Sequence, residues 1–146
     1  MSYATTDDLQ DRLKSFFDQL YADEEAEGGV NLEDAASDIE AAQSEVDGAA
    51  GVRYSVPVEA TAALPLLKNW TLTITEELAW RRSAQGTTPE NVKDRVKEVR
   101  KQLERLAKKE VVIPGAAELS GAASMGGAAI VSCSEPVFTR AKMRGF

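Results

Sequence analysis

The stretch PLLKNWTLTITEELAWRR, residues 65–82, decides the fold. Pro65 is tolerated in the first turn of a helix that starts near Ala62. Four apolar side chains recur at every fourth residue and therefore share one face of this helix: Leu66, Trp70, Ile74 and Leu78. The opposite face carries threonines and Glu76. Because this is the most hydrophobic of the expected helices, we expect it at the centre of the fold.

Two helices are predicted before this central segment. The first begins at Thr5 or Thr6, since either threonine can cap a helix, and it ends near Tyr21. The second begins after Asn31, which is a good N-cap, with Asp34 at the third helical position in a capping-box arrangement. Both segments carry apolar side chains at spacings of three and four residues, so both are expected to bury one face.

One helix is predicted after the central segment, with Thr88 as its cap and Pro89 at its first position. Its apolar seam lasts about two heptads, which is too short for a free coiled coil and indicates the inner side of a bundle. The apolar stripes of the four helices together define a predicted core: Leu13, Phe16, Ile39, Val46, Leu66, Trp70, Ile74, Leu78, Val96, Val99 and Leu103.

Charge is divided unevenly along the chain. Residues 1–50 hold 14 acidic and 2 basic residues, whereas residues 51–146 hold 10 acidic and 15 basic residues. The chain has no histidine, which excludes a Ser-His-Asp triad, a Cys-His pair and a histidine-ligated metal site. Its one cysteine, Cys133, cannot form an internal disulfide, so a reduced setting is expected. We therefore expect a protein without catalytic residues, bound metal or cofactor, and therefore not an enzyme.

An acidic loop separates the first two helices. Six of its positions fit an EF-hand frame imperfectly, because glutamates replace the short ligands and an aspartate replaces the final bidentate glutamate: Asp23, Glu25, Glu27, Gly28, Val30 and Asp34. A solvated loop followed by a helix cap is the simpler interpretation, and cation binding by residues 23–34 stays open.

The basic helix over residues 89–109 offers an alternative function, that of a small nucleic-acid-binding or regulatory protein. Its cations surround the helix instead of forming one stripe, and the acidic first half opposes DNA binding. A solvated helix with charge pairs along its surface is therefore favoured. The chain has no apolar run of about 18 residues, so no membrane-spanning helix is expected.

The last part of the chain is expected to be an extended tail. Residues 111–113 are strand-like and are stopped by Pro114, and 12 of the 15 residues from 115 to 129 are Gly, Ala or Ser. Such a composition cannot bury enough surface to fold alone. The ending VFTRAKMRGF, residues 137–146, combines aromatic anchors with cations and no acid, which favours docking on a partner.

The predicted fold is therefore mainly α. A small four-helix body over residues 1–110 is followed by an extended Gly/Ala-rich tail over residues 111–146, which carries short β segments and docks on a partner.

Four segments resemble the Mu-like phage and prophage family of head–tail adaptor proteins. They are YATTDDLQDRL at residues 3–13, SEVDGAAGVRYSVPV at residues 44–58, the central helix at residues 65–82 and the ending VFTRAKMRGF. Val52 separates Gly51 from the Arg-Tyr pair that follows it, and Pro136 and Ala141 differ from the Arg and the Asp expected at the end motif.

The resemblance implies a structural virion protein. Such adaptors form a ring, commonly of twelve subunits, between the portal of the capsid and a stopper or tail-completion protein. DNA passes through the central channel without sequence-specific binding. The implied location is the head–tail neck of the virion, after assembly in the host cytoplasm, with no membrane contact.

The resemblance also implies roles for the tail. A first set of residues is expected to dock on the portal: Val137, Phe138, Thr139, Arg140, Lys142, Met143, Arg144, Gly145 and Phe146. A second set is expected to add strands to a partner: Val111, Val112, Ile113, Ile130, Val131 and Ser132.

Overall fold

The computed structural model describes residues 1–23, 29–83 and 87–119. Its elements are, in chain order, α1 (Thr6–Leu13), the 3-10 turn η1 (Lys14–Phe16), α2 (Phe17–Leu20), α3 (Leu32–Ala50), α4 (Leu64–Arg82) and α5 (Glu90–Ala107). The described residues contain two isolated bridges and no strand. The mainly helical fold predicted from the sequence is confirmed.

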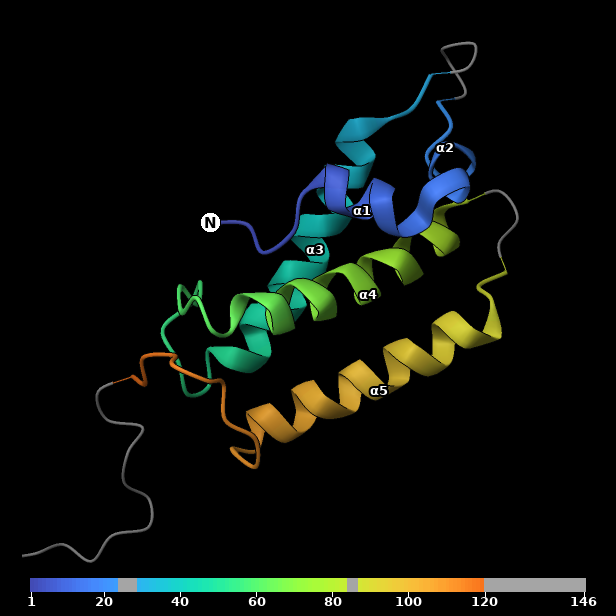
Figure 1. Cartoon of the computed structure of the whole chain (residues 1–146). Coiled ribbons are helices and arrows are strands. Elements are labelled where there is room, and N and C mark those ends of the chain that lie inside the picture. Colours follow the sequence, from blue (N-terminus) through green and yellow to red (C-terminus); the bar gives the residue numbers. More distant parts are fainter. Residues whose placement is uncertain (24–28, 84–86, 120–146) are drawn as a thin grey trace, which may run out of the picture.

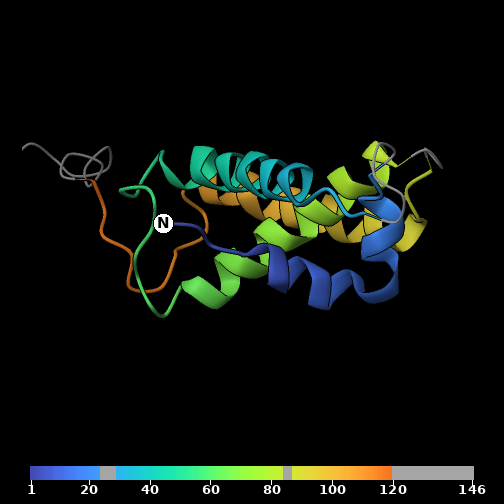
Figure 2. The same ribbon diagram turned by 90° about the horizontal axis from the view of Figure 1, so that it is seen from above.

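Helix α4 lies at the centre of the molecule. It contacts α1, α2, α3 and α5, and Figure 1 shows it running between α1 and α5. Figure 2 shows the same arrangement from above, with α3 lying alongside the other long helices. Burial of α4 extends beyond its apolar stripe, because a run of polar side chains is buried as well: Thr71, Thr73, Thr75, Glu76 and Glu77.

The first predicted helix is broken. Thr5 caps α1 as expected, and its hydroxyl accepts from the Asp8 amide at 3.3 Å while the Asp8 carboxylate accepts from the Thr5 amide at 3.1 Å. At Lys14 the backbone φ is 51°, and the chain continues through η1 into α2. Phe17 is 1% exposed and Phe16 is 49% exposed. The expectation that Phe16 belongs to the core is wrong, because the break shifts the helical phase by one residue.

Most of the other predicted core side chains are buried. They are Leu13, Ile39, Val46, Trp70, Ile74, Val96, Val99 and Leu103. Leu66 and Leu78 are only partly buried at the edge of the core, whereas Leu67 is fully buried. The core of α4 is therefore wider than the single stripe that periodicity indicates, because helices cover it from several sides.

The caps of the two later helices differ in outcome. The Asn31 side chain accepts from the Asp34 amide at 3.1 Å and caps α3 as predicted. The reciprocal half of the capping box is not formed, because the Asn31 amide donates to the Tyr21 carbonyl at 2.8 Å and the Asp34 carboxylate lies 3.2 Å from the Arg82 guanidinium. The prediction that Thr88 caps α5 is wrong. Pro89 is the capping residue, because its ψ of 143° keeps it outside the helix and no side chain caps that end.

The segment after α5 returns to the helical body. Residues 111–113 form no strand within the chain, and Ile113 is 1% exposed in the core. The Ser55 amide donates to the Ala117 carbonyl at 3.1 Å, and the Leu119 amide donates to the Arg53 carbonyl at 2.9 Å. Residues 111–119 of the predicted tail therefore lie against the body. Ile130, Val131 and Ser132, and the docking segment at residues 137–146, lie outside the described residues.

Candidate functional site

The candidate site lies at the end of the bundle from which the chain continues past residue 119. The loop between α3 and α4 and the segment after α5 meet there, and Figures 1 and 2 show both at the same end of the molecule. We call residues 51–60 and 111–119 the tail-end surface. Its second segment, residues 111–119, is the described part of the chain closest in sequence to the predicted docking segment.

Two buried tyrosines fix this surface, Tyr3 to the helical body and Tyr54 between the two segments. The Tyr3 hydroxyl donates to the Asp47 carboxylate at 2.5 Å and accepts from the Val58 amide at 2.7 Å. Burial, followed by the hydrogen bond to Asp47, raises the pKa of Tyr3 to about 12. The Tyr54 hydroxyl accepts from the Ile113 amide at 3.1 Å. Each phenol therefore satisfies a backbone donor that would otherwise be buried without a partner.

Backbone pairing then joins the two segments. An antiparallel bridge links Tyr54 to Glu118. Beside it, the Arg53 guanidinium lies 2.7 Å from the Glu118 carboxylate and 5.6 Å from the centre of the Tyr54 ring. Gly115 has a φ of +72°, a conformation that residues with a Cβ rarely adopt, so glycine suits this turn.

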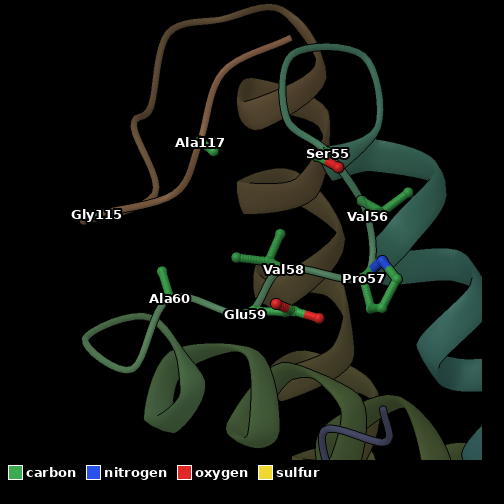
Figure 3. Close-up of a pocket in the computed structure, with 8 residues that line it drawn as sticks. All are labelled: Ser55, Val56, Pro57, Val58, Glu59, Ala60, Gly115 and Ala117. Carbon is green, nitrogen blue, oxygen red and sulfur yellow. The ribbon is translucent and has the colours of Figure 1, made fainter.

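A cavity of about 330 Å³ lies between the two segments. Figure 3 shows its lining residues, which come from both chain segments: Ser55, Val56, Pro57, Val58, Glu59, Ala60, Gly115 and Ala117. Its walls are mainly aliphatic, with one carboxylate. Glu59 is exposed and makes no ion pair or hydrogen bond with any residue that the structure describes. The cavity therefore combines apolar walls with an available negative charge.

Large apolar side chains gather on this surface. Among the described residues, four of the seven exposed large apolar side chains belong to it: Val52, Val56, Val112 and Leu119. Single exposed apolar residues are common, but a concentration at one end of a small domain marks a contact surface.

A second surface lies at the opposite end, between η1, the end of α4 and the start of α5. There Phe16 lies against Trp80, with ring centres 5.6 Å apart, beside a cavity of about 490 Å³. The buried Trp80 Nε1 has no hydrogen-bond partner among the described residues. Arg12 and Arg95 flank this cavity and lie 3.2 Å and 2.8 Å from the Glu76 carboxylate. We call this the aromatic surface.

Most cations of α5 are already paired. The Lys93, Arg95 and Arg100 side chains lie 3.2 Å, 2.8 Å and 2.9 Å from the carboxylates of Glu90, Glu76 and Glu77 respectively. The Glu45 carboxylate, which hydrogen-bonds to Arg100, raises the pKa of that guanidinium. This pairing with acidic residues opposes a nucleic-acid surface on α5, because phosphate contacts need available cations.

Nothing in the described part of the chain forms a cluster of three or more potential metal-ligating side chains. Residues 24–28 of the acidic loop lie outside that part. In the ranges that the structure covers, none of the helices combines the length and apolarity needed to cross a membrane.

Comparison with known families adds the decisive observation. A family model described as "Bacteriophage Mu, Gp36" matches residues 3–132 of the chain. The chain belongs to this family. The Gp36 match therefore takes in the whole helical body and the tail-end surface, and it stops before the docking segment at residues 137–146. No curated protein matches the chain.

Sequence reasoning missed several residues of the tail-end surface. Tyr3 precedes the first helix and has no periodic signal, and Glu59 is one acid among many. One signal could have indicated the two tyrosines: Tyr3 and Tyr54 both lie in stretches that resemble the phage family. A tyrosine in a loop next to a helix end is a reasonable candidate for a buried hydroxyl that binds backbone.

Proposed function

We propose that this Gp36-family protein is a head–tail adaptor of a long-tailed bacteriophage. It is a structural virion protein without catalysis of its own. Copies form a ring, commonly of twelve subunits, between the portal and a stopper or tail-completion protein in the virion neck, and DNA passes through the channel without sequence-specific binding. Assembly takes place in the host cytoplasm. The observation that carries the proposal is the family match over residues 3–132.

The two contact surfaces support this role. The tail-end surface and the aromatic surface lie at opposite ends of α4, and each has exposed apolar side chains beside a cavity. An adaptor needs two separate contact regions, because it binds one partner above and another below. In our proposal the tail-end surface faces the portal, since the docking segment follows it in the sequence.

The distribution of acidic residues also supports the proposal. Five exposed carboxylates on α1, α2 and α3 make no ion pair with other described residues: Asp7, Asp11, Asp18, Glu33 and Glu40. In a ring, one surface of each subunit meets a different surface of its neighbour, so uneven charge suits such contacts. Acidic residues that face the channel would instead repel DNA phosphates.

Deletion of residues 136–146 tests the portal contact. We expect the truncated protein to lose attachment to purified portal in a co-sedimentation assay, while its circular dichroism and thermal unfolding match those of the full chain. A matched control replaces only Arg140, Lys142 and Arg144 with serine and separates the charged from the aromatic contributions. Equal portal binding by the truncated and full-length proteins would remove the docking assignment, and an electron-microscopy image of the complex would count the subunits.

A further inference from the structure

We propose that the cavity of the tail-end surface is a docking site for residues 137–146 of the same chain. Phe138 occupies the cavity and Arg140 pairs with Glu59. The proposed function assigns the same segment to portal binding. Docking within the chain does not depend on that function; only its consequence for assembly rests on it. Docking within the chain is a property of the isolated protein and is tested without portal.

The lining of the cavity defines the chemistry of its occupant. Val56, Pro57 and Ala60 line the cavity from the loop between α3 and α4, and Ala117 lines it from the segment after α5 (Figure 3). A volume of about 330 Å³ is at the small end of ligand pockets and suits one aromatic side chain. Glu59 supplies the only charge in the lining and has no partner among the described residues. The occupant is therefore an apolar side chain with a cation close by.

The segment VFTRAKMRGF has this chemistry in an alternating pattern. In an extended chain, side chains two residues apart project to the same side at about 7 Å spacing. One side then carries two aromatic rings around three cations: Phe138, Arg140, Lys142, Arg144 and Phe146. With Phe138 in the cavity, Arg140 comes within reach of Glu59. The segment contains no acid that would oppose this contact.

The connecting chain favours docking within one molecule over docking between copies. Leu119 is hydrogen-bonded to Arg53, and Ala117 lines the cavity, so the connection starts at the edge of the site. Phe138 follows Leu119 by 19 positions, and most of the residues between them are Gly, Ala or Ser. A flexible chain of that length spans roughly 25 Å on average and keeps its end at a millimolar effective concentration. A weak intrinsic contact is therefore sufficient.

Docking of this kind covers the exposed Val56 side chain in the cavity and the Phe138 ring of the segment together. Each would otherwise be an adhesive surface on the free protein. A partner that binds the segment more tightly displaces it from the cavity, so the free protein is held in a form that releases its docking segment only on assembly.

Hydrogen–deuterium exchange of the full-length protein tests the proposal. We expect amides of residues 138–144 to exchange about fivefold or more slowly than in an unstructured peptide of the same sequence. Glu59→Lys should remove most of this protection, and the double variant Glu59→Lys with Arg140→Glu should restore it. Asp18→Lys is the matched control, because Asp18 is also an exposed acid and makes no ion pair with other described residues, and it lies at the other end of the molecule. Phe138→Ser changes no body residue and should abolish the protection.

Three outcomes would overturn the proposal. They are random-coil exchange of residues 138–144 in the unaltered protein, equal effects of Glu59→Lys and Asp18→Lys, and protection that rises with protein concentration, which would indicate docking on a second copy. Thermal unfolding of each variant verifies that the body is folded. Because portal is absent from this experiment, failure of the adaptor role and failure of docking are separate results.

Discussion

At the scale of single residues, Tyr3 connects parts of the molecule that are distant in sequence. Its hydroxyl lies between the Asp47 carboxylate on α3 and the Val58 amide in the loop before α4. One phenol thus holds the N-terminal segment, the end of α3 and one wall of the tail-end cavity together. Loss of this hydroxyl leaves the buried Val58 amide without its acceptor and takes one donor from the half-buried Asp47 carboxylate.

The pKa of Tyr3 predicts how stability changes at high pH. Burial and the Asp47 bond raise this pKa from 10.0 to about 12, so the folded state favours the neutral phenol. The resulting stabilisation is complete below about pH 10, the unfolded pKa, and is lost as the pH rises through about 12. Tyr3→Phe should lower the free energy of unfolding by about 1 kcal/mol at pH 8 and flatten its decline above pH 10.

Urea titrations at several pH values from about 8 to about 12 measure the difference in the free energy of unfolding between the unaltered protein and Tyr3→Phe. The pKa of Tyr21 is also raised, mainly by burial and then by Asp38, and that residue is present in both proteins. The difference between them therefore isolates Tyr3. Curves that stay parallel above pH 10 would contradict the assignment.

At the scale of elements, the break between α1 and α2 shows where periodicity stops being sufficient. The spacing of apolar residues predicts one helix from Thr5 or Thr6 to Tyr21. The structure has a left-handed residue at Lys14 and a 3-10 turn after it, so the apolar face changes phase. Phe17 then packs with Tyr21, their ring centres 5.2 Å apart, while Phe16 lies on the surface against Trp80.

Replacement of each phenylalanine by alanine distinguishes the two positions. Phe17→Ala should lower the free energy of unfolding by about 3–5 kcal/mol, because it leaves a cavity in the core. Phe16→Ala should lower it by no more than about 1 kcal/mol, since its ring is half exposed and loses mainly the contact with Trp80. Urea unfolding measured side by side gives both values, and the opposite order would return Phe16 to the core.

The N-caps illustrate what local sequence can predict. Asn31 is the predicted cap of α3, and Thr5 is one of the two candidate caps of α1, because a cap depends on a side chain and an amide three residues away. The prediction for Thr88 is wrong, because the backbone of Pro89 stays extended and moves the start of α5 one residue on. The cavity at the tail-end surface had no sequence signal, because its walls come from two segments that only the fold brings together.

At the scale of the whole molecule, the boundary between body and tail is the main difference between expectation and structure. The composition places it at residue 110. In the structure, Ile113 is buried in the core and the backbone of residues 117–119 pairs with Arg53 and Ser55. We therefore expect the independently folding unit to extend to about residue 119.

Two truncations test this boundary. Deletion of residues 120–146 should change the free energy of unfolding by less than about 1 kcal/mol, because it removes no residue of the described body and the contact proposed above is weak. Deletion of residues 111–146 should lower it by about 2–5 kcal/mol, because it empties the site of Ile113 and leaves the Tyr54 hydroxyl without its backbone donor. Thermal and urea unfolding compare the two. Equal stability of both truncations would place the boundary back at residue 110.

The sequence by itself determined the three long helices, two N-caps and the central place of residues 65–82. These features depend on contacts between residues three or four positions apart, which periodicity records directly. Only the tertiary structure decided that Phe17 replaces Phe16 in the core, that Tyr3 and Tyr54 anchor the loops, and that residues 111–119 belong to the body. Those outcomes depend on packing and hydrogen bonds between segments far apart in the chain, and a local pattern carries no record of such partners.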